Sequence, residues 1–157
     1  MKKVLVLGVG QELRGDDGLG PRIVGEWVRA HPDSANQASV QVCAAPGLEL
    51  LEHFANVDAV VLVDAVRSGA RPGTVHVLNP GQLRAFDGTG RNSHGLGLAE
   101  ILALGQELSG PLLPDPIIIL GLEAGPMELG EPLSPDARAA IPAAVAKLEA
   151  LVRAFIS

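Results

Sequence analysis

The chain has one cysteine, Cys43, and no tyrosine, and aromatic residues make up only 3% of its 157 positions. A single cysteine cannot form an internal disulfide or a multi-cysteine metal site. This cysteine usage suits a reducing compartment, so we expect a cytoplasmic protein. Because aromatic residues are scarce, the core must be filled by Val, Leu, Ile and Ala, which is typical of parallel sheets covered by helices.

Long apolar runs and basic clusters are also missing. No apolar stretch approaches the roughly 18 residues of a membrane span, and the run at 3–9 is too short for a signal peptide. The net charge of −6, with no cluster of Lys and Arg, excludes nucleic acid as a partner because phosphates would be repelled. The length and the 47% hydrophobic content predict one domain over residues 1–157.

Strand-like and helix-like patterns alternate along the chain. Runs of Val, Leu and Ile predict strands at 3–9, 40–44, 59–65, 74–78 and 116–122. Amphipathic spacing predicts helices at 21–30, 47–55 and 96–108, and loops are expected at 79–93 and 123–133. With one strand-to-strand step at 59–78, the order predicts a three-layer α/β/α sandwich with a largely parallel sheet of about five strands.

A final helix is expected to begin at Ser134-Pro135-Asp136. Ser is a favoured N-cap, Pro fits the first helical position, and Asp near the N-terminus complements the helix dipole. Pro142 lies inside the same apolar pattern. We expect it to kink the helix or to split it in two.

Two acidic residues and one histidine follow predicted strands or precede a predicted helix. Asp17 follows the first strand, Asp64 lies near the end of the third, and His94 precedes the helix at 96–108. Polar residues at the carboxyl ends of parallel strands share one crevice, where ligands bind. Carboxylates and an imidazole together suit a divalent transition metal. We therefore interpret Asp17, Asp64 and His94 as a candidate site, and the neighbouring Asp16 as a helix-capping residue.

Other readings of the motifs are weaker. The segment starting at Gly8-Val9-Gly10 lacks the third glycine of a dinucleotide fingerprint, and two carboxylates at the helix entry oppose an anionic ligand. We expect Cys43 to be a small buried residue rather than a nucleophile. No G-x-S-x-G or H-E-x-x-H motif occurs, which leaves serine hydrolases and zincins without support. No role is assigned to His31, His53 or His76.

Several short motifs occur in a fixed order over nearly the whole chain, and their order and spacing are more specific than any one of them. They are Leu5-Val6-Leu7-Gly8-Val9-Gly10, Asp16-Asp17-Gly18-Leu19-Gly20-Pro21, Gly47-Leu48-Glu49-Leu50-Leu51, Leu62-Val63-Asp64-Ala65, Pro72-Gly73-Thr74, Ser93-His94-Gly95-Leu96-Gly97, Leu120-Gly121-Leu122-Glu123 and Leu133-Ser134-Pro135. In this respect the sequence resembles the [NiFe]-hydrogenase maturation endopeptidases, which trim hydrogenase large subunits.

The resemblance implies a peptidase of α/β/α fold. It implies that Asp17, Asp64 and His94 are both catalytic residues and metal contacts. The partner would be a [NiFe]-hydrogenase large-subunit precursor that loses its C-terminal extension after nickel insertion. The nickel would be supplied by that precursor, with other divalent metals able to substitute in vitro.

Two departures from the family pattern are present. Gln11 stands where the family usually has Asn, and Cys43-Ala44-Ala45-Pro46 replaces a Gly-Thr segment, which affects substrate docking rather than the proposed triad. Two alternatives stay open: a non-catalytic nickel-sensing chaperone of the same precursor, and a nucleotide-binding enzyme that uses the Gly8–Gly10 loop.

Overall fold

The computed structural model describes residues 1–86, 97–109, 113–125 and 129–157. Within them, five strands form one sheet in the order β2-β1-β3-β5-β4. The strands β2, β1, β3 and β5 run parallel, and β4 pairs with β5 in the antiparallel sense. Their bounds are β1 Val4–Val9, β2 Ser39–Cys43, β3 Ala59–Val66, β4 Val75–Leu78 and β5 Ile117–Glu123.

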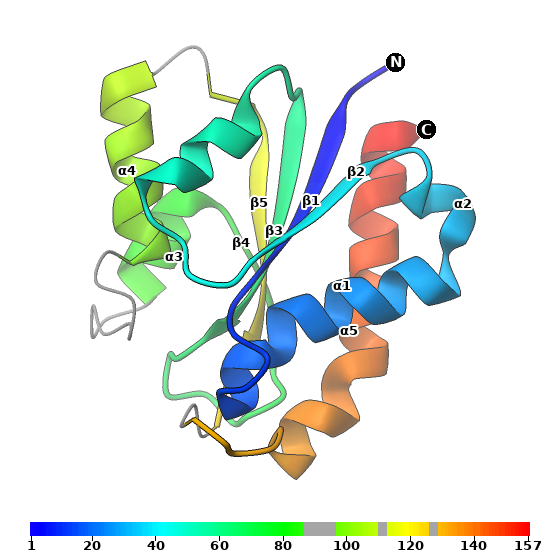
Figure 1. Ribbon diagram of the computed structural model, residues 1–157, viewed down its shortest axis with the longest axis vertical. Coiled ribbons are helices and arrows are strands. Elements are labelled where there is room, and N and C mark those ends of the chain that lie inside the picture. Colours follow the sequence, from blue (N-terminus) through cyan, green and yellow to red (C-terminus); the bar gives the residue numbers. More distant parts are fainter. Residues whose placement is uncertain (87–96, 110–112, 126–128) are drawn as a thin grey trace.

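Helices cover both faces of this sheet, which confirms the three-layer α/β/α prediction (Figure 1). On one face lie α1 Leu19–Ala30, α2 Pro32–Ala35 and α5 Pro135–Ile156. On the other lie the 3₁₀ helix η2 Leu48–Phe54, α3 Pro80–Phe86 and α4 Leu98–Ser109. A short 3₁₀ turn, η1 Gly15–Gly18, leads into α1.

The side chains on the two faces of each central strand belong to two separate hydrophobic clusters. In β3, Val61 and Val63 pack toward α1 and α5, whereas Val60 and Leu62 pack toward η2 and α4. All four side chains are fully buried. Because β-branched and leucine side chains fill both faces, the apolar runs were a reliable strand signal.

The prediction of a loop at 79–93 is wrong for the first part of that stretch, because α3 forms at Pro80–Phe86. The Asn79 side chain accepts the Gln82 backbone N–H at 2.7 Å, and the Gln82 side chain accepts the Asn79 N–H at 2.9 Å. This reciprocal cap, with Pro80 at the first helical position, outweighs the helix-breaking tendency of Pro and Gly. The Leu83 side chain is buried between α3 and the sheet. The rest of that stretch, 87–93, lies outside the described residues.

Two helix expectations need adjustment. The segment predicted as a helix at 47–55 is the 3₁₀ helix η2, which buries Leu50 and Phe54 and leaves Leu48 exposed. The last helix begins as predicted, with the Ser134 side chain accepting the Ala137 N–H. Of the two outcomes expected at Pro142, a kink or a split, the split is wrong, because α5 is one continuous helix through it. Buried residues on both sides of the proline, among them Ile141 and Val145, hold the helix together despite the missing N–H.

A half-buried carboxylate joins the three helices of the first layer. Glu149 of α5 accepts the Trp27 indole N–H at 2.8 Å and the Ser34 hydroxyl at 2.7 Å. Burial by itself would raise the pKa of Glu149. The hydrogen bonds from Ser34 and Trp27, with His31 and Arg153 nearby, outweigh burial and hold the pKa below its usual value.

We expect Glu149→Gln to lower the free energy of unfolding at neutral pH by roughly 1–3 kcal/mol, because hydrogen bonds to a charged acceptor are stronger than those to a neutral one. Because the pKa is lower in the folded state, the contribution of the carboxylate is fully present above the pKa of the unfolded chain and is lost as the pH falls through the folded value. Urea unfolding at neutral pH and near pH 3 measures this.

The difference between Glu149→Gln and the wild type should therefore shrink at acid pH. The exposed Glu100→Gln serves as a matched control that should change little at either pH. A difference for Glu149→Gln that stays constant across the range would contradict the role of the charge.

Candidate functional site

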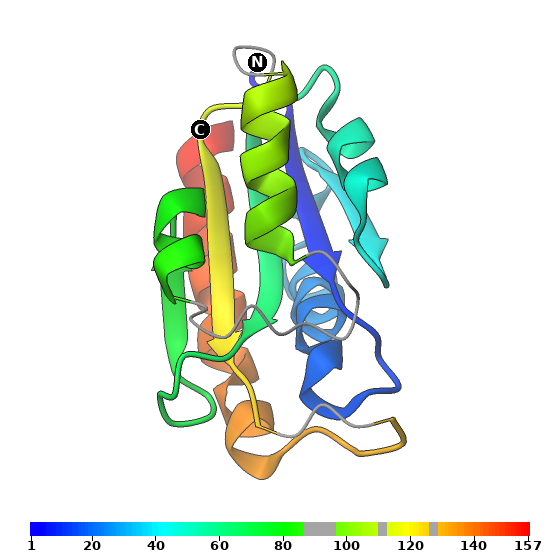
Figure 2. The same cartoon turned by 90° about the vertical axis from the view of Figure 1, so that its left-hand side faces the viewer.

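The carboxyl ends of β1, β3 and β5 point toward the lower end of the molecule, where α1 and α5 begin, and the first turn of α4 on the other face is directed toward the same end (Figures 1 and 2). A backbone contact fixes the start of α1 there. An added Cβ on Gly20 would lie 2.3 Å from the Val9 carbonyl oxygen and 2.4 Å from that of Val63. The helix can therefore sit directly on the ends of β1 and β3 only because residue 20 has no side chain.

The turn between β1 and η1 depends on a second glycine. Gly10 has a φ of +132°, and a Cβ there would lie 1.8 Å from the Asp17 carbonyl oxygen. Its N–H donates to the Cys43 carbonyl at 3.0 Å, which ties the turn to the end of β2. A side chain at position 10 would push η1, and with it Asp17, away from the strand ends.

Asp17 and Asp64 both occur at this end of the sheet. Asp17 belongs to η1, is 7% exposed, and accepts the Gln11 backbone N–H at 3.0 Å. Asp64 is half-buried in β3, on the face that packs toward α4. Because η1 contacts β3 and Gly20 touches the carbonyl of Val63, the elements that carry these two carboxylates are neighbours.

The third predicted residue, His94, lies outside the described residues. The first described residues after it are Gly97 and Leu98, at the start of α4. Among the described residues, no group of three or more His, Cys, Asp or Glu side chains is placed to hold a metal ion. The triad therefore stays a prediction.

The assignment of Asp16 as a helix-capping residue is wrong. The N-cap of α1 is Gly18, and no side chain caps it. Asp16 is instead fully buried, and its carboxylate accepts the Gly125 N–H at 2.6 Å and both the N–H and the hydroxyl of Ser134 at 2.7 Å. It joins η1 to the segment after β5 and to the N-terminus of α5. Its partners are more than 100 residues away in sequence, so local pattern could not reveal them.

A second buried carboxylate, which sequence reasoning did not identify, lies at the end of β5. Glu123 is 2% exposed and accepts both the N–H and the hydroxyl of Ser68. Its Oε1 also lies 3.2 Å from the Nε2 of His76, a residue to which no role was given. The only local signal was a charged residue that ends the apolar run of β5.

Cys43 is only partly buried, so the expectation of a buried cysteine is wrong in that respect, but its environment does not favour a nucleophile. Burial raises the pKa of its thiol, and the nearby Glu49 acts in the same direction, against a backbone hydrogen bond from Ala45. The thiolate is therefore disfavoured, so a nucleophilic role gains no support.

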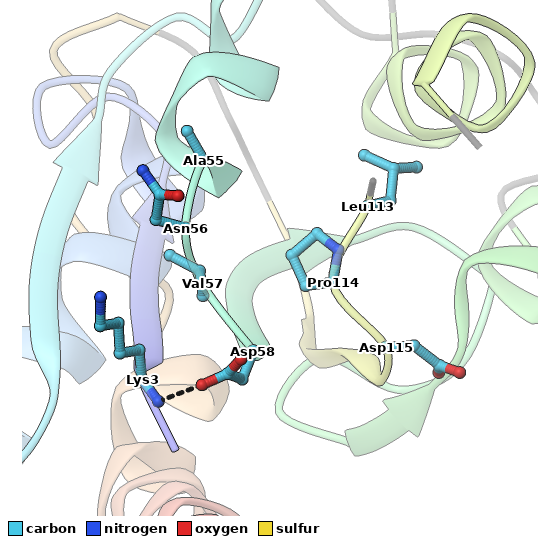
Figure 3. Close-up of a pocket in the computed structure, with 8 residues that line it drawn as sticks. All are labelled: Lys3, Ala55, Asn56, Val57, Asp58, Leu113, Pro114 and Asp115. Atoms are coloured by element: carbon cyan, nitrogen blue, oxygen red, sulfur yellow. Dashed lines mark hydrogen bonds between the residues drawn. The ribbon is translucent and has the colours of Figure 1, made fainter. Parts of the chain in front are cut away.

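A surface pocket of about 730 Å³ lies at the opposite end of the sheet (Figure 3). It is lined by residues that precede strands, including Lys3 before β1, Asp58 before β3 and Asp115 before β5. Lys3 donates its backbone N–H to Asp58 at 2.7 Å. Because ligands of open α/β sheets bind at the carboxyl ends of strands, we do not place the functional site here. No helix among the described residues is long and apolar enough to cross a membrane.

Comparison with known proteins relates the chain to one family. The family model described as hydrogenase maturation protease matches residues 35–151. The hydrogenase expression/formation protein HupD of Rhodobacter capsulatus is 30% identical over 98% of this chain and 73% of its own length. The hydrogenase 2 maturation protease of Escherichia coli is 30% identical over 96% of this chain and 91% of its own length.

Solved structures agree with the sequence relatives. The hydrogenase maturating endopeptidase HybD from E. coli superposes with a TM-score of 0.81 at 27% identity, covering 98% of this chain and 93% of that one. A hydrogenase maturation protease HybD from Thermococcus kodakarensis superposes with a TM-score of 0.71 at 26% identity, covering 96% and 99%. The likeness extends over the whole sheet and both helical layers.

Asp16→Ala should destabilise the protein by about 3 kcal/mol, because it leaves the partly buried donors of Gly125 and Ser134 without their acceptor. Urea unfolding of both forms measures the effect. The control is Asp136→Ala, whose side chain is 53% exposed in the first turn of α5 and which should cost no more than about 1 kcal/mol. Equal losses for the two variants would show that Asp16 acts only as a surface charge.

Proposed function

This chain belongs to the hydrogenase maturation protease family, and from that membership we propose that it removes the C-terminal extension of a [NiFe]-hydrogenase large-subunit precursor. The family makes it a peptidase that processes a hydrogenase precursor. The large subunit, the C-terminal position of the cut and the dependence on nickel are the proposed parts.

We place the processing site at the carboxyl end of the sheet. The observation that carries this placement is the seating of η1 and α1 on the ends of β1 and β3, which makes the elements bearing Asp17 and Asp64 neighbours. His94 is proposed as the third member, since it precedes α4, whose first turn is directed toward the same end of the sheet.

The residue types suit contact with nickel that the precursor already carries, so the metal is part of the substrate. A borderline divalent metal accepts carboxylate and imidazole ligands together. Such a metal can polarise a carbonyl or activate water. The chain's own contribution is two carboxylates on fixed backbone, one of them held by the Gln11 N–H.

The two departures from the family pattern are compatible with this proposal. Gln11 serves Asp17 through its backbone N–H, a contact that does not depend on the side chain at that position. The segment Cys43-Ala44-Ala45-Pro46 begins at the last residue of β2, so its change concerns the flank of the proposed site rather than Asp17 or Asp64. The names of the relatives, which are proteases and endopeptidases, favour the peptidase over the chaperone alternative.

Asp17→Asn, Asp64→Asn and His94→Ala should each abolish release of the C-terminal peptide, because each removes one proposed contact to the precursor's metal. The readout is the intact mass of the purified precursor after incubation with each variant. His53→Ala, a histidine change on η2, should process normally. Retained cleavage by His94→Ala, in a variant with an unchanged melting temperature, would remove His94 from the site.

Nickel loading of the precursor should decide whether it is cut. We expect loss of a C-terminal peptide from nickel-loaded precursor and none from the metal-free form, because the proposed contacts need the metal. The same mass measurement on both forms tests this. Cleavage of both forms at equal rates would refute nickel recognition, and binding without cleavage of the loaded form would favour the chaperone alternative.

A further inference from the structure

Arg14 lies at the carboxyl end of the sheet, one turn of chain before Asp17. Its backbone carbonyl accepts the Asp17 N–H at 3.0 Å, and its own N–H donates to the Gln11 carbonyl at 3.1 Å. The Gln11 N–H in turn donates to the Asp17 carboxylate. Arg14 therefore belongs to the same short loop that positions the first carboxylate of the candidate site.

The Arg14 guanidinium has no partner in the part of the chain that the structure describes. Its Nε is buried and makes no hydrogen bond there. The two Nη atoms likewise make no hydrogen bond or ion pair with a described residue, but unlike Nε they are not buried, and the residue as a whole is partly exposed. A ligand that arrives from solvent can therefore reach the Nη atoms.

An arginine that served only as a surface charge would not need this arrangement. A buried N–H without an acceptor costs free energy, and a surface arginine normally keeps its charged head in water. The exposed Glu12 and Glu131 occur in the same loop and in the segment bonded to it, yet among the described residues neither forms an ion pair with Arg14. The guanidinium is thus available to an anion of another molecule.

Two exposed leucines occur in the same pair of segments. The Gly130 N–H donates to the Leu13 carbonyl at 2.8 Å and the Gly15 N–H to the Glu131 carbonyl at 2.9 Å, so the segments lie side by side at the lower end of the molecule (Figures 1 and 2). Leu13 is 75% exposed, and Leu129 is 71% exposed. Exposed apolar side chains that lie together mark protein-binding surfaces. This surface therefore suits a protein ligand better than a free small anion.

We propose that Arg14 is a further substrate-binding residue of the processing site and that its guanidinium binds a carboxylate of the precursor. The two Nη atoms offer a fork that donates two parallel hydrogen bonds to a carboxylate, and such charge-assisted pairs are strong and specific in geometry. The carboxylate belongs either to an acidic side chain near the cut or to the C-terminus of the extension. This inference rests on the proposed function of precursor cleavage.

Arg14→Met separates substrate binding from a structural role. Met keeps an unbranched stem and removes the buried N–H that has no acceptor, so we expect an unchanged or higher melting temperature. With nickel-loaded precursor, kcat/KM should fall about tenfold or more, mainly through KM, because a charge-assisted pair is lost from the ground state and the transition state alike. The control is Arg71→Met, which removes an 82% exposed guanidinium from the β3–β4 turn and should cleave normally. A lower melting temperature with unchanged KM for Arg14→Met would show that Arg14 is structural.

Changes in the precursor identify the carboxylate. The acidic side chains on both sides of the cut are changed one at a time to Asn or Gln, and in a separate sample the C-terminus is amidated. One of these changes should raise KM for the wild type by the same factor as Arg14→Met does, and should have no further effect on Arg14→Met. A side-chain change that does so identifies an internal acidic residue, and amidation identifies the C-terminus. Purely additive effects for every change would overturn carboxylate recognition.

Binding measured by titration calorimetry, apart from cleavage, distinguishes the two proposals. If the wild type cleaves and Arg14→Met matches it in KM and in affinity for nickel-loaded precursor, the inference is overturned and the proposed function stands. If the wild type binds the precursor but leaves it uncut, the proposed function fails, whereas weaker binding by Arg14→Met still supports the contact with Arg14. A wild type that neither binds nor cleaves overturns both.

Discussion

The contact between the first turn of α1 and the carbonyls of Val9 and Val63 is the constraint on which the rest of the site depends. A Cβ at Gly20 would lie far inside van der Waals distance of both oxygens, so no other residue fits without moving the helix. This contact places η1 over the ends of two strands at once. The positions of the Asp16 and Asp17 carboxylates depend on this contact. The Asp16 carboxylate points into the protein, and the Asp17 carboxylate accepts the Gln11 N–H.

Asp16, Glu123 and Glu149 are largely withdrawn from solvent and differ in their partners. Asp16 accepts from neutral donors, whereas Glu149 accepts from Trp27 and Ser34 with His31 and Arg153 nearby, and each of these two joins three parts of the chain. Such groups stabilise the fold because carboxylate oxygens that are taken from water find donors. Glu123 accepts from Ser68 and lies 3.2 Å from the His76 imidazole, so its partners come from β4 and from the segment after β3.

Sequence patterns predicted the structure where local chemistry decides it. They gave no signal where contacts between residues far apart in the sequence decide it. Strands such as Ala59–Val66 were predictable because both faces are buried and β-branched. The cap of α5 at Ser134 was predictable for the same local reason. Helix α3 was missed because a side-chain cap at Asn79 and Gln82 outweighed the composition. The contacts of Asp16 with Ser134 and of His76 with Glu123 could not be predicted, because the partners are 118 and 47 residues apart.

The antiparallel direction of the edge strand β4 determines which of its residues lie near the candidate site. A parallel edge strand would begin at the far end of the sheet and would need a crossover connection to get there. Because β4 instead follows β3 through a short turn and runs antiparallel to β5, its first residues lie beside the carboxyl ends of its neighbours. His76 reaches the row of Asp64 for this reason. The single strand-to-strand step in an otherwise alternating chain thus brings an imidazole to the end of the sheet where the carboxylates already lie.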